Sequence, residues 1–132
     1  TAAIATIKKH KKCDVGNHIN VLGTYFQNEL KKIGTRTGVK ITVGGLAAFS
    51  AWSFDYSNGN AIKTLYIHKM LARHILAKNA FYFSYAHKKE DVDFYLHHIK
   101  EVFLELHELI EKNEVESNLL GPEAHTGFKR LA

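Results

Sequence analysis

The clearest pattern along the chain is an apolar stripe of helical spacing between residues 92 and 110. Apolar side chains recur there every three or four residues, which is typical of an amphipathic helix with one buried face. Glu90 and Asp91 lie in its first turn, where negative charge suits the positive end of the helix dipole. We therefore predict a long helix from about Lys88. Its stripe is formed by Val92, Tyr95, Leu96, Ile99, Val102, Phe103, Leu106, Leu109 and Ile110.

The same spacing predicts three further helices. Residues 2–11 read as one helix, which the segment "CDVGN" interrupts. A second helix is expected from an N-cap at Asn17, closed by Gly34 and Gly38. A third follows the turn cluster "SNGN". The apolar stripe of the second helix is Ile19, Leu22, Phe26, Leu30 and Ile33, and that of the third is Ile62, Leu65, Tyr66, Met70 and Leu71.

Three segments alternate with a period of two, as half-buried strands do. In "VKITVGG", apolar Val39, Ile41 and Val43 alternate with polar residues. In "AFSAWSFDY", one face holds Phe49, Ala51, Ser53 and Asp55, and the other holds Trp52, Phe54 and Tyr56. A third strand is expected over Phe81–Tyr85, directly before the last helix.

The predicted order is helix, helix, strand, strand, helix, strand, helix. Each strand has one face to cover and each helix has one apolar stripe. We therefore expect an α+β fold, with a largely antiparallel sheet of three or four strands and helices packed on one face. The 132 residues suffice for one domain, which we place at residues 1–112, followed by an extended tail over 113–132.

Composition adds limits on function. The formal net charge is +5, but only Lys8, Lys9, Lys11 and Lys12 form a basic run, so we expect no nucleic-acid partner. No apolar segment approaches the 20 or so residues that a membrane span needs, and we expect no membrane partner. A single cysteine, Cys13, allows no internal disulfide and favours a cytoplasmic setting.

Residue types that often carry chemistry are present without a diagnostic motif. The nine histidines include no pair spaced one helical turn apart, so we expect no metal site. Cys13 has His10 and Asp14 as neighbours, yet no nucleophile motif surrounds it. Lys40 precedes two glycines, as a Schiff-base lysine often does, but we interpret it as a solvent-facing strand residue. We therefore expect no catalytic residue in the chain.

Several segments together resemble a known family. "GTRTGVKITVGGLAAFSAWSFD", "TLYIHKMLARHILAKNAFYFSYAHKKEDVDFYL" and, within the latter, the stretch Ser84–Asp93 are similar to the C-terminal small domain of class III pyridoxal-phosphate aminotransferases. The nearest branch looks like glutamate-1-semialdehyde aminomutase and its relatives in polysaccharide biosynthesis, which the tail "LLGPEAHTGFKR" also resembles. The opening "TAAIATIKKHKK" resembles the helix that leaves the large domain, which suggests a piece of a longer protein.

The resemblance implies an enzyme that transfers an amino group to a keto or aldehyde substrate. Its pyridoxal phosphate and Schiff-base lysine would belong to a large domain outside this chain, so the chain alone would bind no cofactor and be inactive. The parent would be a cytoplasmic homodimer that acts on a small-molecule amino donor and a keto acceptor. Asn79 and Phe81, at the start of the last strand, are the candidate substrate-proximal residues.

Two alternatives stay open. "HILAKNAFYF" is shorter than the corresponding aminomutase segment and has no glutamate there, which favours an aminotransferase over an aminomutase (an isomerase). The second alternative is a stand-alone basic α+β module that binds a polyanion or a protein partner through the basic run and exposed aromatic residues.

Overall fold

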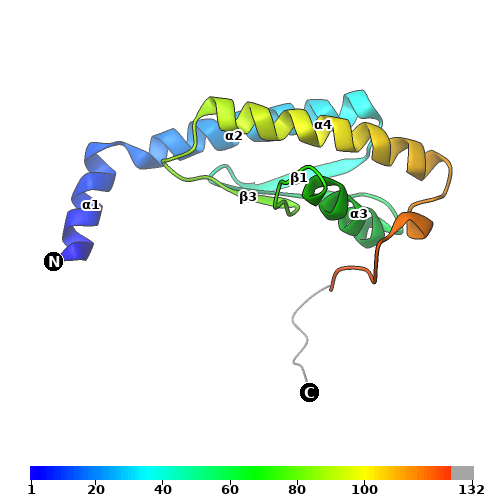
Figure 1. The fold of residues 1–132 in the computed structure, drawn as a ribbon. Helices are drawn as coiled ribbons and strands as arrows, with labels where there is room; N and C mark the ends of the chain where they lie inside the picture. Colours follow the sequence, from blue (N-terminus) through cyan, green and yellow to red (C-terminus); the bar gives the residue numbers. More distant parts are fainter. Residues whose placement is uncertain (126–132) are drawn as a thin grey trace, which may run out of the picture.

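The computed structural model describes residues 1–125, and its elements follow the predicted order (Figure 1). The elements are α1 (Ala2–Lys12), α2 (Val15–Thr37), β1 (Ile41–Leu46), β2 (Phe49–Phe54), α3 (Gly59–Leu71), β3 (Ala80–Tyr82), α4 (Lys89–Glu111) and a short 3-10 turn (Glu116–Asn118). The predicted α+β class is confirmed.

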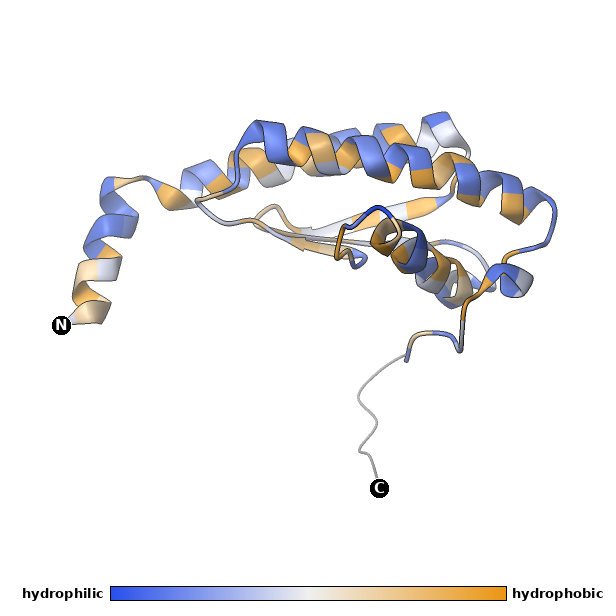
Figure 2. Cartoon of the chain, in the orientation of Figure 1, coloured by the Kyte–Doolittle hydropathy of each residue, from blue (hydrophilic) through white to orange (hydrophobic). Residues whose placement is uncertain are grey.

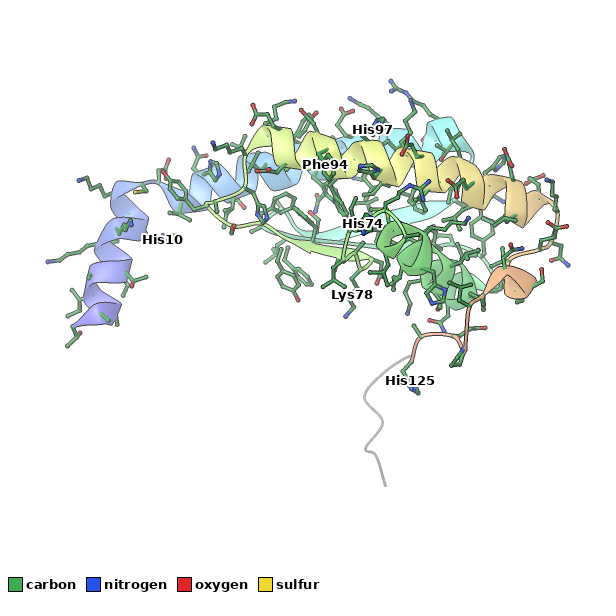
Figure 3. All side chains as sticks on the ribbon, in the orientation of Figure 1. His10, His74, Lys78, Phe94, His97 and His125 are labelled. Atoms are coloured by element: carbon green, nitrogen blue, oxygen red, sulfur yellow. The ribbon has the colours of Figure 1, made fainter. Side chains whose placement is uncertain are left out.

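The three strands form one antiparallel sheet in the order β1-β2-β3. Helices α2 and α4 run side by side over one face of this sheet (Figure 1). Helix α3 packs against α4 and against β2. Apolar and polar residues alternate along α4 in the bands expected of a helix with one buried face (Figure 2). The opposite face of the sheet is covered by no helix of residues 1–125 (Figure 1).

Aromatic rings fill the space between the helices and the sheet. Phe26 of α2 is fully buried and contacts Trp52, Phe81 and Tyr95, with ring centroids 5.9, 5.4 and 6.1 Å away. The hydroxyl groups of Tyr66 and Tyr95 meet at 3.0 Å inside this core. Burial raises the pKa of Tyr95 to about 12 and also raises that of Tyr66. Both phenols therefore stay neutral at ordinary pH and satisfy each other by hydrogen bonding.

The second helix is longer at both ends than its sequence pattern predicts. It begins at Val15, so Asn17 lies inside it and is not its N-cap. The break before it is two residues, Cys13 and Asp14, and Asp14 has a left-handed φ of 46°. Gly34 does not close the helix, because it faces the sheet: a Cβ there would lie 2.8 Å from Cγ1 of Ile41. The helix ends at Gly38, whose φ of 76° favours glycine.

The strands differ from the prediction at their ends. β1 starts at Ile41, so Val39 precedes the strand, although its side chain is buried. β3 ends at Tyr82 because a turn follows, in which the Ser84 N–H donates to Nδ1 of His87. The two faces predicted for β2 are confirmed, since Trp52 and Phe54 are buried and Phe49 and Ser53 are exposed. Leu71, predicted on the buried stripe of α3, is 56% exposed because it lies at the very end of that helix.

Polar contacts join the helices to one another. Asp93 of α4 accepts a hydrogen bond from the hydroxyl of Tyr25 in α2 at 2.6 Å and pairs with Lys89. Glu105 of α4 binds Lys69 of α3 and Arg73, which follows the end of α3. Partial burial raises the pKa of Glu105, but the hydrogen bonds from these two cations outweigh that effect and hold it below its ordinary value. These contacts fix α3 and α2 against α4.

The two ends of the described chain differ in their packing. Helix α1 has no buried residue and projects away from the domain (Figure 1). The C-terminal segment instead lies on α3, where the Ala124 N–H donates to Oγ1 of Thr64 at 2.9 Å. Residues 126–132 of the predicted tail lie outside the described residues. In the described part, no helix combines the length and apolar character that a membrane crossing requires.

We predict opposite effects for two glycine-to-alanine changes in α2. A Cβ at Gly23 would lie 1.7 Å from the Ala47 carbonyl oxygen, so Gly23→Ala is expected to lower the free energy of unfolding by about 2 kcal/mol. Gly16 has open space around its Cα, so Gly16→Ala should raise stability by up to about 1 kcal/mol through helix propensity. Urea denaturation of both variants measures this. Equal stability of the two would contradict the contact between α2 and the β1–β2 turn.

Candidate functional site

The uncovered face of the sheet is the surface on which this fold presents side chains to a partner or ligand. We call it the open face and define it by the strand residues that point away from α2 and α4. These residues are Thr42, Gly44 and Leu46 of β1, Phe49, Ala51 and Ser53 of β2, and Ala80 and Tyr82 of β3. The antiparallel register places them in rows across the strands.

One row of the open face is an apolar ridge made of Leu46, Phe49 and Tyr82. Leu46 is 77% exposed and Tyr82 is 70% exposed, although both are large. The rings of Phe49 and Tyr82 stack with their centroids 4.2 Å apart. Large contiguous apolar surface of this kind marks an interaction site more often than scattered single residues do. The next row, Gly44, Ala51 and Ala80, is a floor of small residues.

At the other end of the open face, a cavity of about 330 Å³ lies between the end of β2 and the start of α3. We call it the Lys63 pocket. Its polar lining residues are Ser53, Ser57, Asn60, Lys63 and Asn79. Ser53 belongs to both the open face and the pocket, so the two are continuous. Strand geometry puts Ser53 about 14 Å from Phe49, four residues away along β2.

Carboxylates near this pocket are already hydrogen-bonded. Asp55 accepts from the hydroxyls of Thr42 at 2.7 Å and Ser53 at 3.0 Å. Glu123 of the C-terminal segment accepts from Nδ2 of Asn60 at 2.8 Å. Glu116 accepts from Nδ2 of Asn58 at 2.6 Å, which holds the pKa of Glu116 below its ordinary value. Lys63 makes no ion pair with any of the described residues.

The two candidate residues from the sequence have different positions. Asn79 lines the Lys63 pocket, and its Nδ2 donates to the Trp52 carbonyl oxygen at 2.7 Å, while the Trp52 N–H donates to the Asn79 carbonyl oxygen. Phe81 points the other way, into the aromatic core, where its ring stacks on Tyr95 at 5.1 Å. The structure thus brings Asn79 to a cavity and places Phe81 under the helices.

The sequence reading missed Tyr82 and Lys63. Tyr82 is adjacent to Phe81, and the period of two sends neighbouring side chains to opposite faces. The alternation was visible in the sequence, but "FYFSY" is aromatic on both faces and does not say which face the helices cover. Lys63 gave no signal at all, because a lysine on a helix usually faces solvent.

A larger cavity, of about 620 Å³, opens at the far end of α2. Lys31, Lys40 and Asp55 line it, together with Gly34, Thr35, Gly38, Val39 and Ile41. Lys40 is exposed immediately before β1, as its strand pattern predicts. The cavity lies at the carboxyl end of α2, where the negative pole of the helix dipole and Asp55 offset the two lysines. It is separate from Asn79 and from the ridge.

Cys13 and several histidines of the described chain lie in contacts between elements or on the surface. Cys13 lies at the end of α1 and near Tyr85. Its electrostatic interaction with the Tyr85 hydroxyl raises the pKa of Tyr85. Nε2 of His18 lies 2.8 Å from the His87 carbonyl oxygen, a contact that ties α2 to the turn before α4. His97 and His98 lie 3.3 Å from Glu101 on the surface of α4. Residues 1–125 contain no group of three His, Cys, Asp or Glu side chains suited to hold a metal ion.

Comparisons of the chain with protein-family models, with curated proteins and with solved structures find no match.

We predict a structural contribution from Asn79 that is independent of any ligand. Asn79→Ala removes the hydrogen bond to the Trp52 carbonyl and should lower the free energy of unfolding by about 1 kcal/mol. Ser57→Ala is the matched control, because Ser57 lines the same pocket without a hydrogen bond to the described residues, and its effect should stay within about 0.5 kcal/mol. Urea denaturation measures both. Unchanged stability of Asn79→Ala would mean that its amide is free for a ligand.

Proposed function

We propose that this chain is the C-terminal small domain of a pyridoxal-phosphate-dependent aminotransferase and that it covers and orients the substrate. The observation that carries the proposal is the open face: a sheet covered on one side only, with an exposed aromatic ridge and a polar pocket that includes Asn79. Such a face suits a domain that closes over a site built elsewhere. The α+β layer and the ordered segments that resemble class III enzymes support the same reading.

The described residues do not fit the cofactor itself. Lys40 is the lysine that precedes a glycine pair, yet its side chain is exposed and its nearest cavity opens to solvent. We place the Schiff-base lysine and the phosphate contacts in another part of the parent polypeptide. The residues of this chain would bind and orient substrate and exclude water, which contributes to rate by positioning the reacting groups. Alone, the chain would be inactive.

The finer points of the proposal follow from the resemblance. The parent would be a cytoplasmic homodimer, and it would transfer an amino group between a small-molecule donor and a keto or aldehyde acceptor, such as a sugar or a semialdehyde. An aminotransferase is favoured over an aminomutase, because the segment before β3 lacks the glutamate of the aminomutases. On the open face, Tyr82 and Asn79 are the side chains best placed to meet a substrate, whereas Phe81 would support the sheet from below.

The natural gene provides the test. An open frame that continues upstream of the Thr1 codon for several hundred codons is expected, and its full product should bind pyridoxal phosphate and transfer amino groups. In that enzyme, Tyr82→Ala should lower kcat/KM for the acceptor by about tenfold, which corresponds to about 1.4 kcal/mol of lost interaction. Leu104→Ala, at an exposed site on α4, is the control and should leave the kinetics unchanged. A start codon within a few residues of Thr1 would overturn the proposal.

A second function is favoured by one specific observation. Lys8, Lys9, Lys11 and Lys12 all lie exposed on α1, which projects from the domain. A stand-alone module could bind a polyanion or an acidic protein surface through this helix. Binding of that kind weakens steeply as salt concentration rises, because counterions are released. Salt-dependent binding of heparin to the chain would support this function, and no binding at low salt would exclude a polyanion.

The open face leads to a prediction about the chain on its own. Without a covering domain, we expect reversible self-association at high concentration, because burial of the ridge removes apolar surface from water. Sedimentation velocity over a concentration series measures it. The double variant Leu46→Gln with Tyr82→Gln should be more monomeric, while Phe94→Gln, at an exposed site on α4, should behave as the parent chain. A chain that is monomeric throughout would count against the ridge as a contact surface.

A further inference from the structure

We infer that the Lys63 pocket is an anion-binding subsite, which takes a carboxylate or phosphate group of a small molecule. The pocket brings one cation together with side chains able to donate hydrogen bonds, in a cavity of about 330 Å³. That volume exceeds what a lone carboxylate or phosphate needs and leaves room for the atoms attached to it. Strength of binding at such a site comes from charge-assisted hydrogen bonds.

Lys63 is the centre of the subsite. Its side chain is half-buried against the pocket, not extended into solvent. Two other half-buried cations lie nearby in the sequence, Lys69 of α3 and Arg73 just after the helix, and both are paired with Glu105 of α4. Lys63 has no such carboxylate among the described residues. An anion from outside the chain would give Lys63 the partner that Lys69 and Arg73 already have.

Two further lining residues have donor capacity to spare. The hydroxyl of Ser57 makes no hydrogen bond to the described residues. Nδ2 of Asn79 uses one of its two hydrogens on the Trp52 carbonyl and has a second one left. The carboxylate of Asp55 lines the larger cavity and is not among the residues that line the Lys63 pocket, and its two oxygens accept from Thr42 and Ser53.

The chain already places one of its own carboxylates at the rim of this pocket. Oε2 of Glu123 accepts from Nδ2 of Asn60, a residue of the pocket lining, and the Ala124 carbonyl oxygen accepts from the same nitrogen at 2.9 Å. An acidic side chain from 60 residues further along the sequence is therefore held beside Lys63's cavity. Glu123 would act as an internal competitor, which a bound anion has to overcome.

The larger cavity lined by Lys31 and Lys40 is a weaker candidate for the same chemistry. There the two lysines face Asp55 and the carboxyl end of α2, both of which oppose an anion. The run of lysines on α1 is exposed to solvent, and the cavity of about 270 Å³ that Lys9 lines is otherwise formed by residues such as Cys13 and Tyr85. Neither surface has a lining residue on the open face, whereas the Lys63 pocket shares Ser53 with it.

As a substrate subsite, the pocket rests on the proposed function. In an aminotransferase, it would hold an anionic group remote from the reacting carbon. A ligand that also reaches the ridge would be about 14 Å long, from the strand spacing between Ser53 and Phe49. Tyr82 and Phe49 would then contact an uncharged ring or chain at its other end. The substrate class that follows is an extended carbonyl compound with a carboxylate or phosphate at one end.

The test is a titration of the ¹⁵N-labelled 132-residue chain with inorganic phosphate and, separately, with acetate, at constant ionic strength. Saturable amide shifts are expected at Ser57, Asn60, Lys63 and Asn79. Lys63→Gln should weaken the affinity at least about tenfold. Lys100→Gln removes one charge from an exposed site on α4 and should leave the affinity unchanged. Glu123→Gln removes the internal competitor and should tighten binding several-fold.

Saturation by phosphate alone assigns a phosphate ligand, and saturation by acetate alone assigns a carboxylate. Shifts confined to α1, shifts that do not saturate, or a Lys63→Gln chain that binds as the parent does would each overturn the subsite. A Glu123→Gln chain with unchanged affinity would overturn the role of Glu123 as competitor. This titration uses no pyridoxal phosphate, so it tests the subsite separately from the proposed function. If the chain binds an anion but the full gene product does not transfer amino groups, the proposed function is wrong and the subsite is still supported.

Discussion

Burial of one aromatic cluster decides how every layer of this domain is placed. The ring of Phe26, on α2, contacts rings from β2, from β3 and its following residue, and from α4. A ring of this size is strongly driven out of water, and it has space only between the helices and the sheet. Once Phe26 is buried, α2 and α4 must lie on the same face, and Trp52 and Phe81 must turn toward them. The opposite face then has no helix left to cover it.

The candidate site follows from that constraint. Because Trp52 and Phe81 point inward, the pleat sends Phe49, Ser53 and Tyr82 outward. The open face is therefore a consequence of core packing, and its ridge is the outer half of the same strands that build the core. The domain thus combines a rigid inner face with an outer face that is free to meet another molecule. This combination is what the proposed covering role requires.

Helix α3 links the core to the pocket. Tyr66 on its inner side is fully buried and shares a hydrogen bond with Tyr95, and Lys69 and Arg73 bind Glu105. These contacts fix the rotation of α3 about its axis. The fixed rotation turns Lys63 and Asn60 toward the end of β2. There they line the cavity together with Asn79, which is hydrogen-bonded to the Trp52 carbonyl. The two lysines of α3 therefore differ in their surroundings. Lys69, on the side that faces α4, is paired with Glu105, whereas Lys63, on the side that faces the pocket, has no ion pair within the described chain.

The sequence by itself determined the elements and their order. Periods of 3.6 and 2.0 residues depend only on which side chains prefer water, so α4 and the two faces of β2 could be read directly. The ends of the elements were harder to predict. Gly34 is a residue type that often ends a helix, but here it allows a close approach of α2 to Ile41 that no local sequence pattern reveals. Phe81 and Tyr82 show the same limit, since both are aromatic and only the position of α2 and α4 decides which one is buried. Asn79 was found because it borders a strand, whereas the isolation of Lys63 from any described carboxylate depends on contacts between residues far apart in the chain. Local chemistry specified the helices and strands, and tertiary packing alone decided which face stayed open and which charges met.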